Sequence, residues 1–133
     1  MKLRKAGPPT VRQIPQSLAL VVCGIGIVAS ACGGGPDLTP EAAEGRRIAE
    51  ENGCAACHGA DGQGGVGPAW QGLHGSTVEL DDGTSVAADH DYLERSIVDP
   101  EAQKVAGYTI NMPPNTLGPA EVASIIAYIE EIS

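Results

Sequence analysis

Large aromatic side chains are scarce in this chain of 133 residues, which has one tryptophan, three tyrosines and no phenylalanine. Side chains of this size supply much of the apolar surface that a small domain buries. A domain of about 100 residues with so few of them would have a thin core on its own. The scarcity therefore argues against a core made of the protein's own side chains alone. It favours an apolar group that is not an amino acid as part of the core.

Basic residues are also few, and half of them lie near the N-terminus. Lys2, Arg4, Lys5 and Arg12 are four of the eight lysines and arginines, whereas the first acidic residue is Asp37. The rest of the chain therefore has a formal charge of 4 − 17 = −13. Such an acidic surface argues against binding to nucleic acid or direct adsorption to anionic lipid, and it favours protein partners with a basic docking face. The alternative explanation is that the charge only keeps the protein soluble.

The apolar run from Leu18 to Ala29 is too short to span a membrane comfortably, because a transmembrane helix needs about 20 apolar residues. A basic segment precedes the run and small residues follow it. This order is typical of an export signal, so residues 1–31 are predicted to be a signal peptide. We expect the protein to work in the periplasm or on the outer face of the cytoplasmic membrane.

The end of the signal allows two outcomes. Ala29-Ser30-Ala31 suits ordinary cleavage. Cys32 follows directly, however, and glycines then begin a flexible tether over residues 32–38. Small residues before a lone cysteine resemble a bacterial lipoprotein signal, although Ala29 stands where leucine is commonest. The resemblance implies that Cys32 is lipidated and anchors the protein to a membrane; the alternative is a soluble exported form.

The segment Cys54-Ala55-Ala56-Cys57-His58 has the C-x-x-C-H pattern of a c-type haem attachment site. Two thiols at this spacing can each add to one of the two vinyl groups of a porphyrin, and the next side chain is then delivered to the iron. Cys54 and Cys57 are the predicted anchors, and His58 is the predicted proximal ligand. One covalently bound haem c would also supply the apolar bulk that the scarce aromatic residues leave missing.

Two other kinds of site use a C-x-x-C pair. A redox dithiol of the thioredoxin type would need strands and helices in alternation around the motif, which the sequence lacks. A zinc site would need two more ligands nearby, and the other cysteines lie far from the motif: Cys23 is in the predicted signal peptide and Cys32 directly follows it. Cys23 is interpreted as an apolar residue of the signal, so disulfides are not expected either.

Met112 is the candidate for a sixth ligand to the iron, because the chain has two methionines and Met1 is the initiator. Two prolines follow it and stiffen the backbone where the sulfur must point. The alternative is that Met112 only fills the core. The iron would then be five-coordinate and open to peroxide or a diatomic gas, with His74 and His90 as possible distal groups.

The two ends of the domain are predicted to be helices. Residues 39–52 begin with Thr39 as N-cap and carry an apolar face that includes Gly45. A second helix begins at residue 118, with apolar residues at the spacing i, i+3, i+4 and i+7: Val122, Ile125, Ile126 and Ile129. A glycine inside a helix costs about 1 kcal/mol. We therefore expect Gly45 to mark a close contact between the two helices.

The residues between these helices predict smaller elements. Residues 76–80 and 84–87 flank an Asp-Gly turn and are predicted to form a short hairpin. Asp89 or Asp91 is expected to cap a further helix, which an Asp-Pro pair stops. One more turn is expected over residues 101–106.

Together these features resemble class I cytochrome c over residues 39–133. The resemblance rests on the haem motif, Gly67-Pro68, Met112-Pro113, and terminal helices that would cross near Gly45 and Tyr128. It implies an all-α fold in which helices wrap around one covalent haem and a short β-hairpin is inserted.

A more specific similarity is to the cytochrome c domain fused to subunit II of some bacterial haem-copper oxidases. It is carried by Gly65-Val66-Gly67-Pro68-Ala69-Trp70-Gln71-Gly72-Leu73, by the Asp-Gly hairpin, and by the stretch from Ser96 to Tyr108. The sequence shows neither a copper-binding domain nor a pair of transmembrane helices before the haem motif. We therefore expect a free-standing, lipid-tethered relative rather than subunit II itself.

The resemblance also implies roles for individual residues. Pro68 would offer its carbonyl to the free ring nitrogen of His58, which fixes the tautomer. Trp70 and Tyr108 would line the haem pocket. From its sequence context alone Trp70 is either such a wall or a half-exposed contact with a partner, and we favour the wall.

The function that we expect is one-electron transfer in an exported respiratory chain, by a monomeric, monohaem carrier without catalytic residues. A terminal haem-copper oxidase is the acceptor by resemblance only. Two alternatives stay open: a five-coordinate haem sensor or peroxidase, and a fixed cytochrome subunit of a larger oxidoreductase complex.

Overall fold

The structure, a computed structural model, describes residues 37–133. The predicted signal peptide, residues 1–31, lies outside the described residues, and so do Cys32 and most of the predicted tether. None of the helices within residues 37–133 combines the length and the apolar character that a membrane-spanning segment needs.

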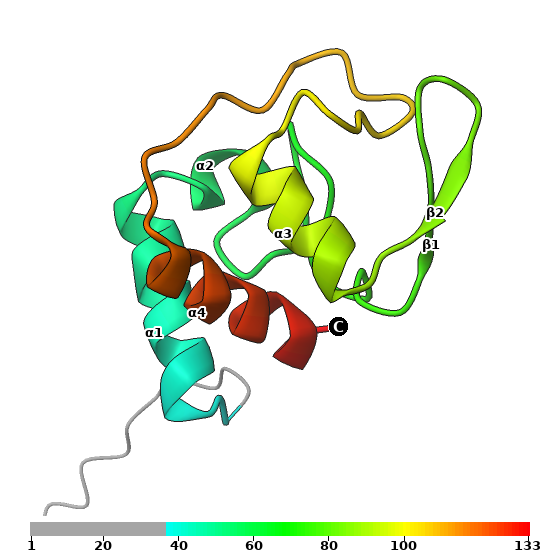
Figure 1. Cartoon of the computed structure of the whole chain (residues 1–133). Coiled ribbons are helices and arrows are strands. Elements are labelled where there is room, and N and C mark those ends of the chain that lie inside the picture. Colours follow the sequence, from blue (N-terminus) through cyan, green and yellow to red (C-terminus); the bar gives the residue numbers. More distant parts are fainter. Residues whose placement is uncertain (1–36) are drawn as a thin grey trace, which may run out of the picture. The chain divides into compact units, whose positions relative to one another are not determined.

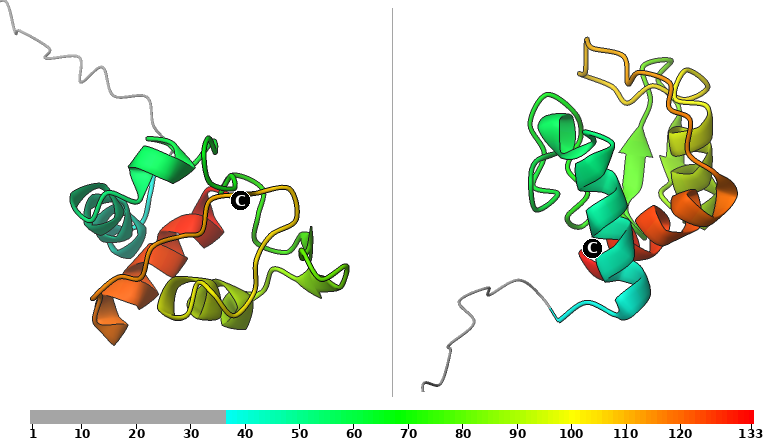
Figure 2. Two further views of the ribbon diagram at one scale, coloured as in Figure 1. Left: turned by 90° about the horizontal axis from the view of Figure 1, so that it is seen from above. Right: turned by 90° about the vertical axis from the view of Figure 1, so that its left-hand side faces the viewer.

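Four helices and one two-stranded sheet make up the described part of the chain (Figure 1). In chain order they are α1 (Pro40–Glu51), α2 (Ala55–His58), β1 (Thr77–Glu79), β2 (Ser85–Ala87), α3 (His90–Val98) and α4 (Pro119–Glu131). The predicted all-α fold with a short β-hairpin is confirmed. Helix α4 packs against both α1 and α3. Figure 2 shows the long loop that joins α3 to α4.

Helix α1 begins and ends as its sequence predicts. The Thr39 side chain accepts a hydrogen bond from the Ala42 amide (3.3 Å), and Pro40 takes the first helical position, where no amide donor is needed. At the other end the Asn52 amide donates to the Ile48 carbonyl (3.0 Å). The buried residues of α1 are Ala42, Gly45, Ile48 and Ala49. They form the face that carries Gly45, as predicted.

Helix α4 crosses α1 at Gly45. A Cβ atom built on Gly45 would lie 1.8 Å from the carbonyl oxygen of Ser124. No side chain fits in that space, so only glycine permits the crossing. The residues that α4 buries include the whole predicted stripe: Val122, Ile125, Ile126, Tyr128 and Ile129.

Strands β1 and β2 pair in antiparallel fashion, with Val78 opposite Val86. Each is shorter than the segment predicted for it, 76–80 and 84–87. Leu80 forms an isolated antiparallel bridge with Val105. The predicted turn over residues 101–106 is therefore only partly right: the amide of Ala102 closes a turn with the Asp99 carbonyl (3.0 Å), and the chain then runs along the hairpin.

Helix α3 is capped by Asp89, the first of the two predicted caps. Its Oδ1 atom accepts a hydrogen bond from the Tyr92 amide (2.9 Å). The helix buries Tyr92, Leu93 and Ile97. It ends at Val98, immediately before the Asp-Pro pair that predicts its end.

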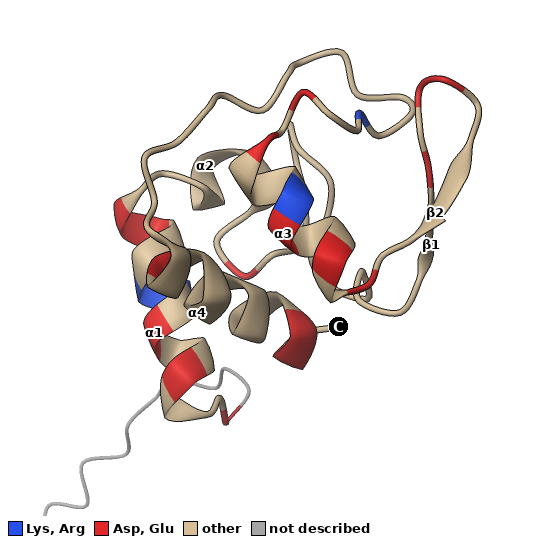
Figure 3. Cartoon of the chain, viewed as in Figure 1, with Lys and Arg blue, Asp and Glu red and all other residues tan. Residues whose placement is uncertain are grey.

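The basic residues of the described part lie on α1, on α3 and in the loop after α3 (Figure 3). Arg46 and Arg47 form ion pairs with carboxylates on α1 and in the following loop. Lys104 pairs with Glu101 (2.9 Å). Because three of these four basic groups are engaged in this way, the acidic excess dominates the surface that a partner meets.

The contact between His90 and Glu130 predicts that stability depends on pH. Nδ1 of His90 donates a hydrogen bond to Oε1 of Glu130 (3.1 Å), which links the start of α3 to α4. This bond, together with nearby Glu94 and Asp91, raises the pKa of His90 above its usual 6.5. The contact therefore stabilises the fold fully below about pH 6.5, and this stabilisation is lost as the pH rises through the raised pKa. Because His90 is exposed, we expect an effect under about 1 kcal/mol.

Urea unfolding of the wild type and of Glu130→Gln, each at about pH 5.5 and about pH 8.5, checks this prediction. The wild type should lose stability at the higher pH. The variant should lose less, because it lacks the carboxylate that accepts from His90. An equal loss in both proteins would contradict the role given to the contact.

Candidate functional site

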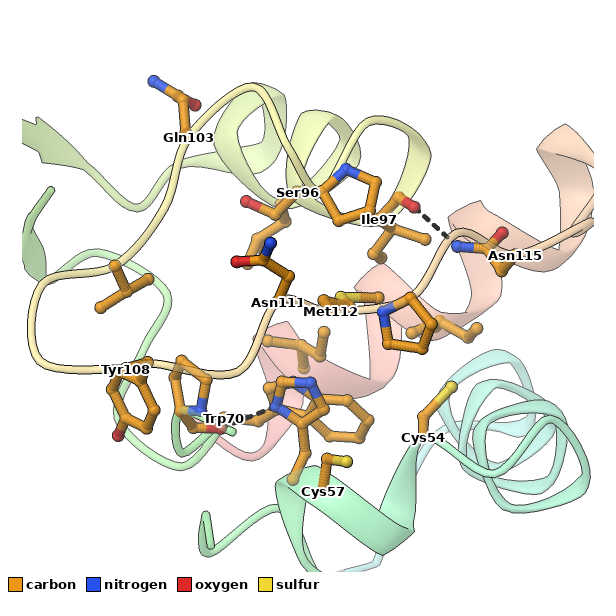
Figure 4. A pocket seen from close by; sticks show the side chains of 18 of the residues that line it. Cys54, Cys57, Trp70, Ser96, Ile97, Gln103, Tyr108, Asn111, Met112 and Asn115 are labelled. Atoms are coloured by element: carbon orange, nitrogen blue, oxygen red, sulfur yellow. Dashed lines mark hydrogen bonds between the residues drawn. The ribbon is translucent and has the colours of Figure 1, made fainter. Parts of the chain in front are cut away.

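A mostly apolar pocket lies between α2, α3 and the loop before α4 (Figure 4). In Figure 4 the loop that carries Asn111 and Met112 closes one side, and Cys54 and Cys57 lie on the other. Apolar side chains from α3, α4 and the hairpin complete the lining: Val78, Leu93, Ile97, Ile125 and Ile129. The pocket brings together all seven residues that the sequence assigns to a haem site: Cys54, Cys57, His58, Pro68, Trp70, Tyr108 and Met112.

The short helix α2, which the sequence does not predict as a separate element, positions the C-x-x-C-H motif. Gly53, in the left-handed conformation (φ +76°), separates it from α1. Cys54 is its N-cap, and the His58 amide donates to the Cys54 carbonyl (3.0 Å). Residues three and four apart lie on one face of a helix. One turn therefore delivers Cys54, Cys57 and His58 to the same pocket. The spacing of these three residues in the sequence is the feature that could have indicated this helical turn.

The imidazole of His58 is 9% exposed, and its Nδ1 lies 2.8 Å from the carbonyl oxygen of Pro68. A carbonyl can only accept, so Nδ1 carries the proton and Nε2 keeps a free lone pair. Burial lowers the pKa of His58, against the opposing effect of the hydrogen bond to Pro68. The ring is therefore neutral at neutral pH, which is the form that binds a metal ion.

Gly67 allows the chain to pass close to this imidazole. A Cβ atom at Gly67 would lie 3.0 to 3.3 Å from three ring atoms of His58. The Gly67 amide donates to the Cys57 carbonyl (2.9 Å), and the Gly64 amide donates to the His58 carbonyl (2.7 Å). The glycine-rich loop is thus held against α2, and this brings the Pro68 carbonyl to the ring.

Met112 is half-buried in the loop between α3 and α4. Asn115, which the sequence does not single out, anchors this loop. Its Nδ2 donates to the Ile97 carbonyl at the end of α3 (2.7 Å), and its Oδ1 accepts from the Leu117 amide (3.2 Å). The sequence feature that could have indicated this role is an asparagine, a typical turn residue, directly after two prolines. The thioether is therefore held at the pocket by a stiff segment that is tied to α3.

The two aromatic residues predicted to line the pocket lie at different depths. Trp70 is 7% exposed, and its ring stacks on that of His58, with centroids 4.7 Å apart and planes 17° apart. Tyr108 is 41% exposed, and neighbouring Ile110 is 64% exposed. Trp70 is therefore an inner wall, and Tyr108 belongs to the rim. The sequence does not predict the stacking of Trp70 on His58.

The hydroxyl of Ser96 is the one buried side-chain oxygen or nitrogen within residues 37–133 that has no hydrogen-bond partner. Ser96 lines the pocket, as do Gln103 and Asn111 (Figure 4). A buried polar atom without a partner costs about 1–3 kcal/mol. A bound group that is mostly apolar but carries polar substituents would relieve this cost, and haem, with two propionate carboxylates, is such a group.

The alternative sites raised by the sequence find little support in this part of the chain. His74 and His90 do not line the pocket, because both face Glu130. Among the described residues no group of three or more histidine, cysteine, aspartate or glutamate side chains could hold a metal ion. Burial raises the pKa of the Cys54 thiol, which is the opposite of the low pKa that a redox dithiol needs.

The donor groups in the pocket fit a covalently bound haem. Cys54 and Cys57 are free thiols on one helical turn, and His58 offers one unprotonated nitrogen. Met112 adds a thioether from a different loop. A C-x-x-C-H pair of thiols with an adjacent imidazole is the set that c-type haem requires.

The family comparison agrees with this set of residues. The model of the cytochrome c family matches residues 42–133, well over half of the chain. No curated protein matches the chain. The chain belongs to the cytochrome c family, whose members bind haem c covalently and generally carry electrons.

Proposed function

We propose that the protein transfers single electrons through one haem c, with Cys54 and Cys57 as covalent anchors and His58 and Met112 as the iron ligands. The observation that carries this proposal is the state of His58: its Nδ1 is engaged by Pro68 at 2.8 Å, and its free Nε2 shares a pocket with both thiols and the thioether. When bound, haem supplies an iron that cycles between the ferrous and ferric states, and a thioether ligand favours the ferrous state.

Fast electron transfer needs ligands that move little between the two states, and the chain's own contacts provide this rigidity. Pro68 holds the His58 ring in one tautomer and one orientation. Asn115 ties the Met112 loop to α3. Apart from the haem ligands, no acid, base or nucleophile in the pocket is needed. These contacts support a carrier rather than a catalyst.

The proposal is tested on holoprotein made in a host with haem-maturation machinery. Haem should stay with the chain through denaturing electrophoresis, and a redox titration should be reversible and follow a one-electron curve. The variant with both Cys54→Ser and Cys57→Ser is the control, and it should lose its haem on denaturation. Release of haem from the wild type, or rapid turnover of peroxide, would contradict the proposal.

We further propose that the electrons pass to a terminal haem-copper oxidase in an exported respiratory chain. The similarity of residues 65–73 and of the hairpin to the domain fused to oxidase subunit II supports this acceptor. The formal charge of 4 − 17 = −13 after the leader supports docking to a basic face of the partner. Transfer to the oxidase should therefore slow as ionic strength rises. A rate that is independent of salt would argue for a different kind of docking.

We also propose that the protein is exported and anchored to a membrane by a lipid. The basic and apolar leader supports export, and Cys32, followed by glycines, supports lipidation. Both lie outside the described residues. The substitution Cys32→Ser should move the protein from the membrane fraction to the soluble fraction, because the residue that carries the lipid is then missing. Unchanged fractionation would rule out this anchor.

A further inference from the structure

We propose that Trp70 is a positioning residue that fixes the orientation of the His58 imidazole and lowers the reduction potential of the haem, an inference that rests on the proposed ligation by His58. The two rings stack, with centroids 4.7 Å apart and planes 17° apart. This separation lies within the range of aromatic pairs in contact, about 4.5 to 7 Å. His58 therefore has the Pro68 carbonyl at one edge and the indole against one face.

The indole is itself held in place by the fold. Trp70 is 7% exposed, and its amide donates to the Gly62 carbonyl (2.7 Å). Its ring meets Tyr128 of α4 edge to face, with centroids 6.1 Å apart and planes 88° apart. Tyr128 is buried in the core. Because the indole cannot shift without moving this core, it is a fixed surface against which the imidazole rests.

Two contacts on the same ring have different effects. The hydrogen bond to Pro68 fixes the position of Nδ1, but it resists tilting of the ring out of its plane only weakly. The indole face opposes that tilt from one side. If His58 holds the haem iron, the magnetic spectra of the ferric holoprotein would depend on the orientation of its imidazole, so a change in the stack should appear in those spectra.

The stack also acts through charge. The face of an aromatic ring carries partial negative charge and attracts positive charge. An imidazole bound to ferric iron is more positive than one bound to ferrous iron. Trp70 therefore stabilises the ferric form more than the ferrous form, which lowers the reduction potential. The electron removed in oxidation leaves from the iron, and Trp70 itself is neither oxidised nor reduced.

A fluorotryptophan series tests the charge effect without a change in packing. Trp70 is the only tryptophan in the chain, so fluorinated analogues enter at this position alone. Fluorine withdraws electron density from the ring face and changes its size little. The midpoint potential of the holoprotein should rise stepwise with the number of fluorine atoms. A potential that stays constant through the series would overturn this part of the proposal.

Substitutions test the positioning effect. Trp70→Leu removes the stacking face and should change the spread of the haem methyl shifts in NMR spectra of the ferric protein. Trp70→Phe keeps a ring face and should retain most of the wild-type pattern. Tyr128→Leu is the control, because it removes packing from Trp70 but no contact from His58. Unchanged haem methyl shifts in Trp70→Leu, or equal changes in Trp70→Leu and Tyr128→Leu, would show that Trp70 only packs in the core and does not position His58. If Trp70→Leu does not fold, the fluorinated series still tests the charge effect and Trp70→Phe still tests the positioning effect, because loss of the wild-type shift pattern in Trp70→Phe would overturn it.

Failure of the proposed function and failure of the role of Trp70 give different experimental results. A wild-type protein with high-spin iron that binds carbon monoxide would disprove ligation by Met112, whereas the fluorinated series would still report on the stack against His58. A six-coordinate wild type with a flat fluorinated series would disprove only the role of Trp70.

Discussion

Replacing Gly45 with alanine should lower the free energy of unfolding by about 2 kcal/mol or more. The added Cβ would lie 1.8 Å from the Ser124 carbonyl oxygen and 2.9 Å from the Ile125 amide nitrogen. Both atoms belong to the α4 backbone, so relief requires the two helices to separate. Overpacking of a core costs about 1–3 kcal/mol and occasionally more, and a clash with helix backbone at this distance belongs at or above the upper end of that range. Alanine gains about 1 kcal/mol over glycine in a helix, so the net loss is about 2 kcal/mol or more.

Denaturant unfolding of the holoprotein measures this change. Ala43→Gly is the matched control, because Ala43 is exposed on the same helix and reports the helix propensity alone. The control should cost about 1 kcal/mol. If Gly45→Ala is neutral or stabilising, the close crossing of α1 and α4 at this residue is wrong.

Replacing Met112 with alanine should open the sixth position of the iron. Ferric protein should become partly high-spin, reduced protein should bind carbon monoxide, and the reduction potential should fall, because the thioether no longer favours the ferrous state. Axial ligation spans roughly 0.8 V of potential, so a fall on the order of 0.1 V or more is expected. Stability should decrease less than it does in Gly45→Ala, because Met112 is only half-buried in a loop.

Ile110→Ala is the control for this experiment. Ile110 lies two residues before Met112 and is 64% exposed, so its loss should leave the iron ligands in place. Visible spectra and potentiometric titration of the three proteins give the comparison. A Met112→Ala protein with the wild-type spectrum and potential would show that another group, or none, occupies the sixth position.

The features that the sequence predicts well are those with local information. Thr39 and Pro40 mark the start of α1, the apolar stripe marks α4, and Gly45 marks the contact between them. The C-x-x-C-H motif is local in the same sense, because its chemistry depends on neighbouring residues. These signals were enough to predict the helical fold and the position of the pocket.

The features that the sequence does not predict depend on residues that meet only after folding. Leu80 pairs with Val105, Trp70 stacks on His58, and Asn115 binds the end of α3. No periodicity signals such contacts in advance. Helix α2 was not predicted for a different reason: four residues are too few to show a helical periodicity, although the spacing of the haem motif is consistent with one helical turn.

We propose that a six-coordinate iron between His58 and Met112 carries single electrons. The decisive experiment records visible spectra of the oxidised and reduced holoprotein, with carbon monoxide added to the reduced form. We expect low-spin spectra, a weak sulfur-to-iron band in the oxidised form and no shift with carbon monoxide. High-spin spectra that shift with carbon monoxide would contradict it and indicate an open iron site, as in a sensor or peroxidase.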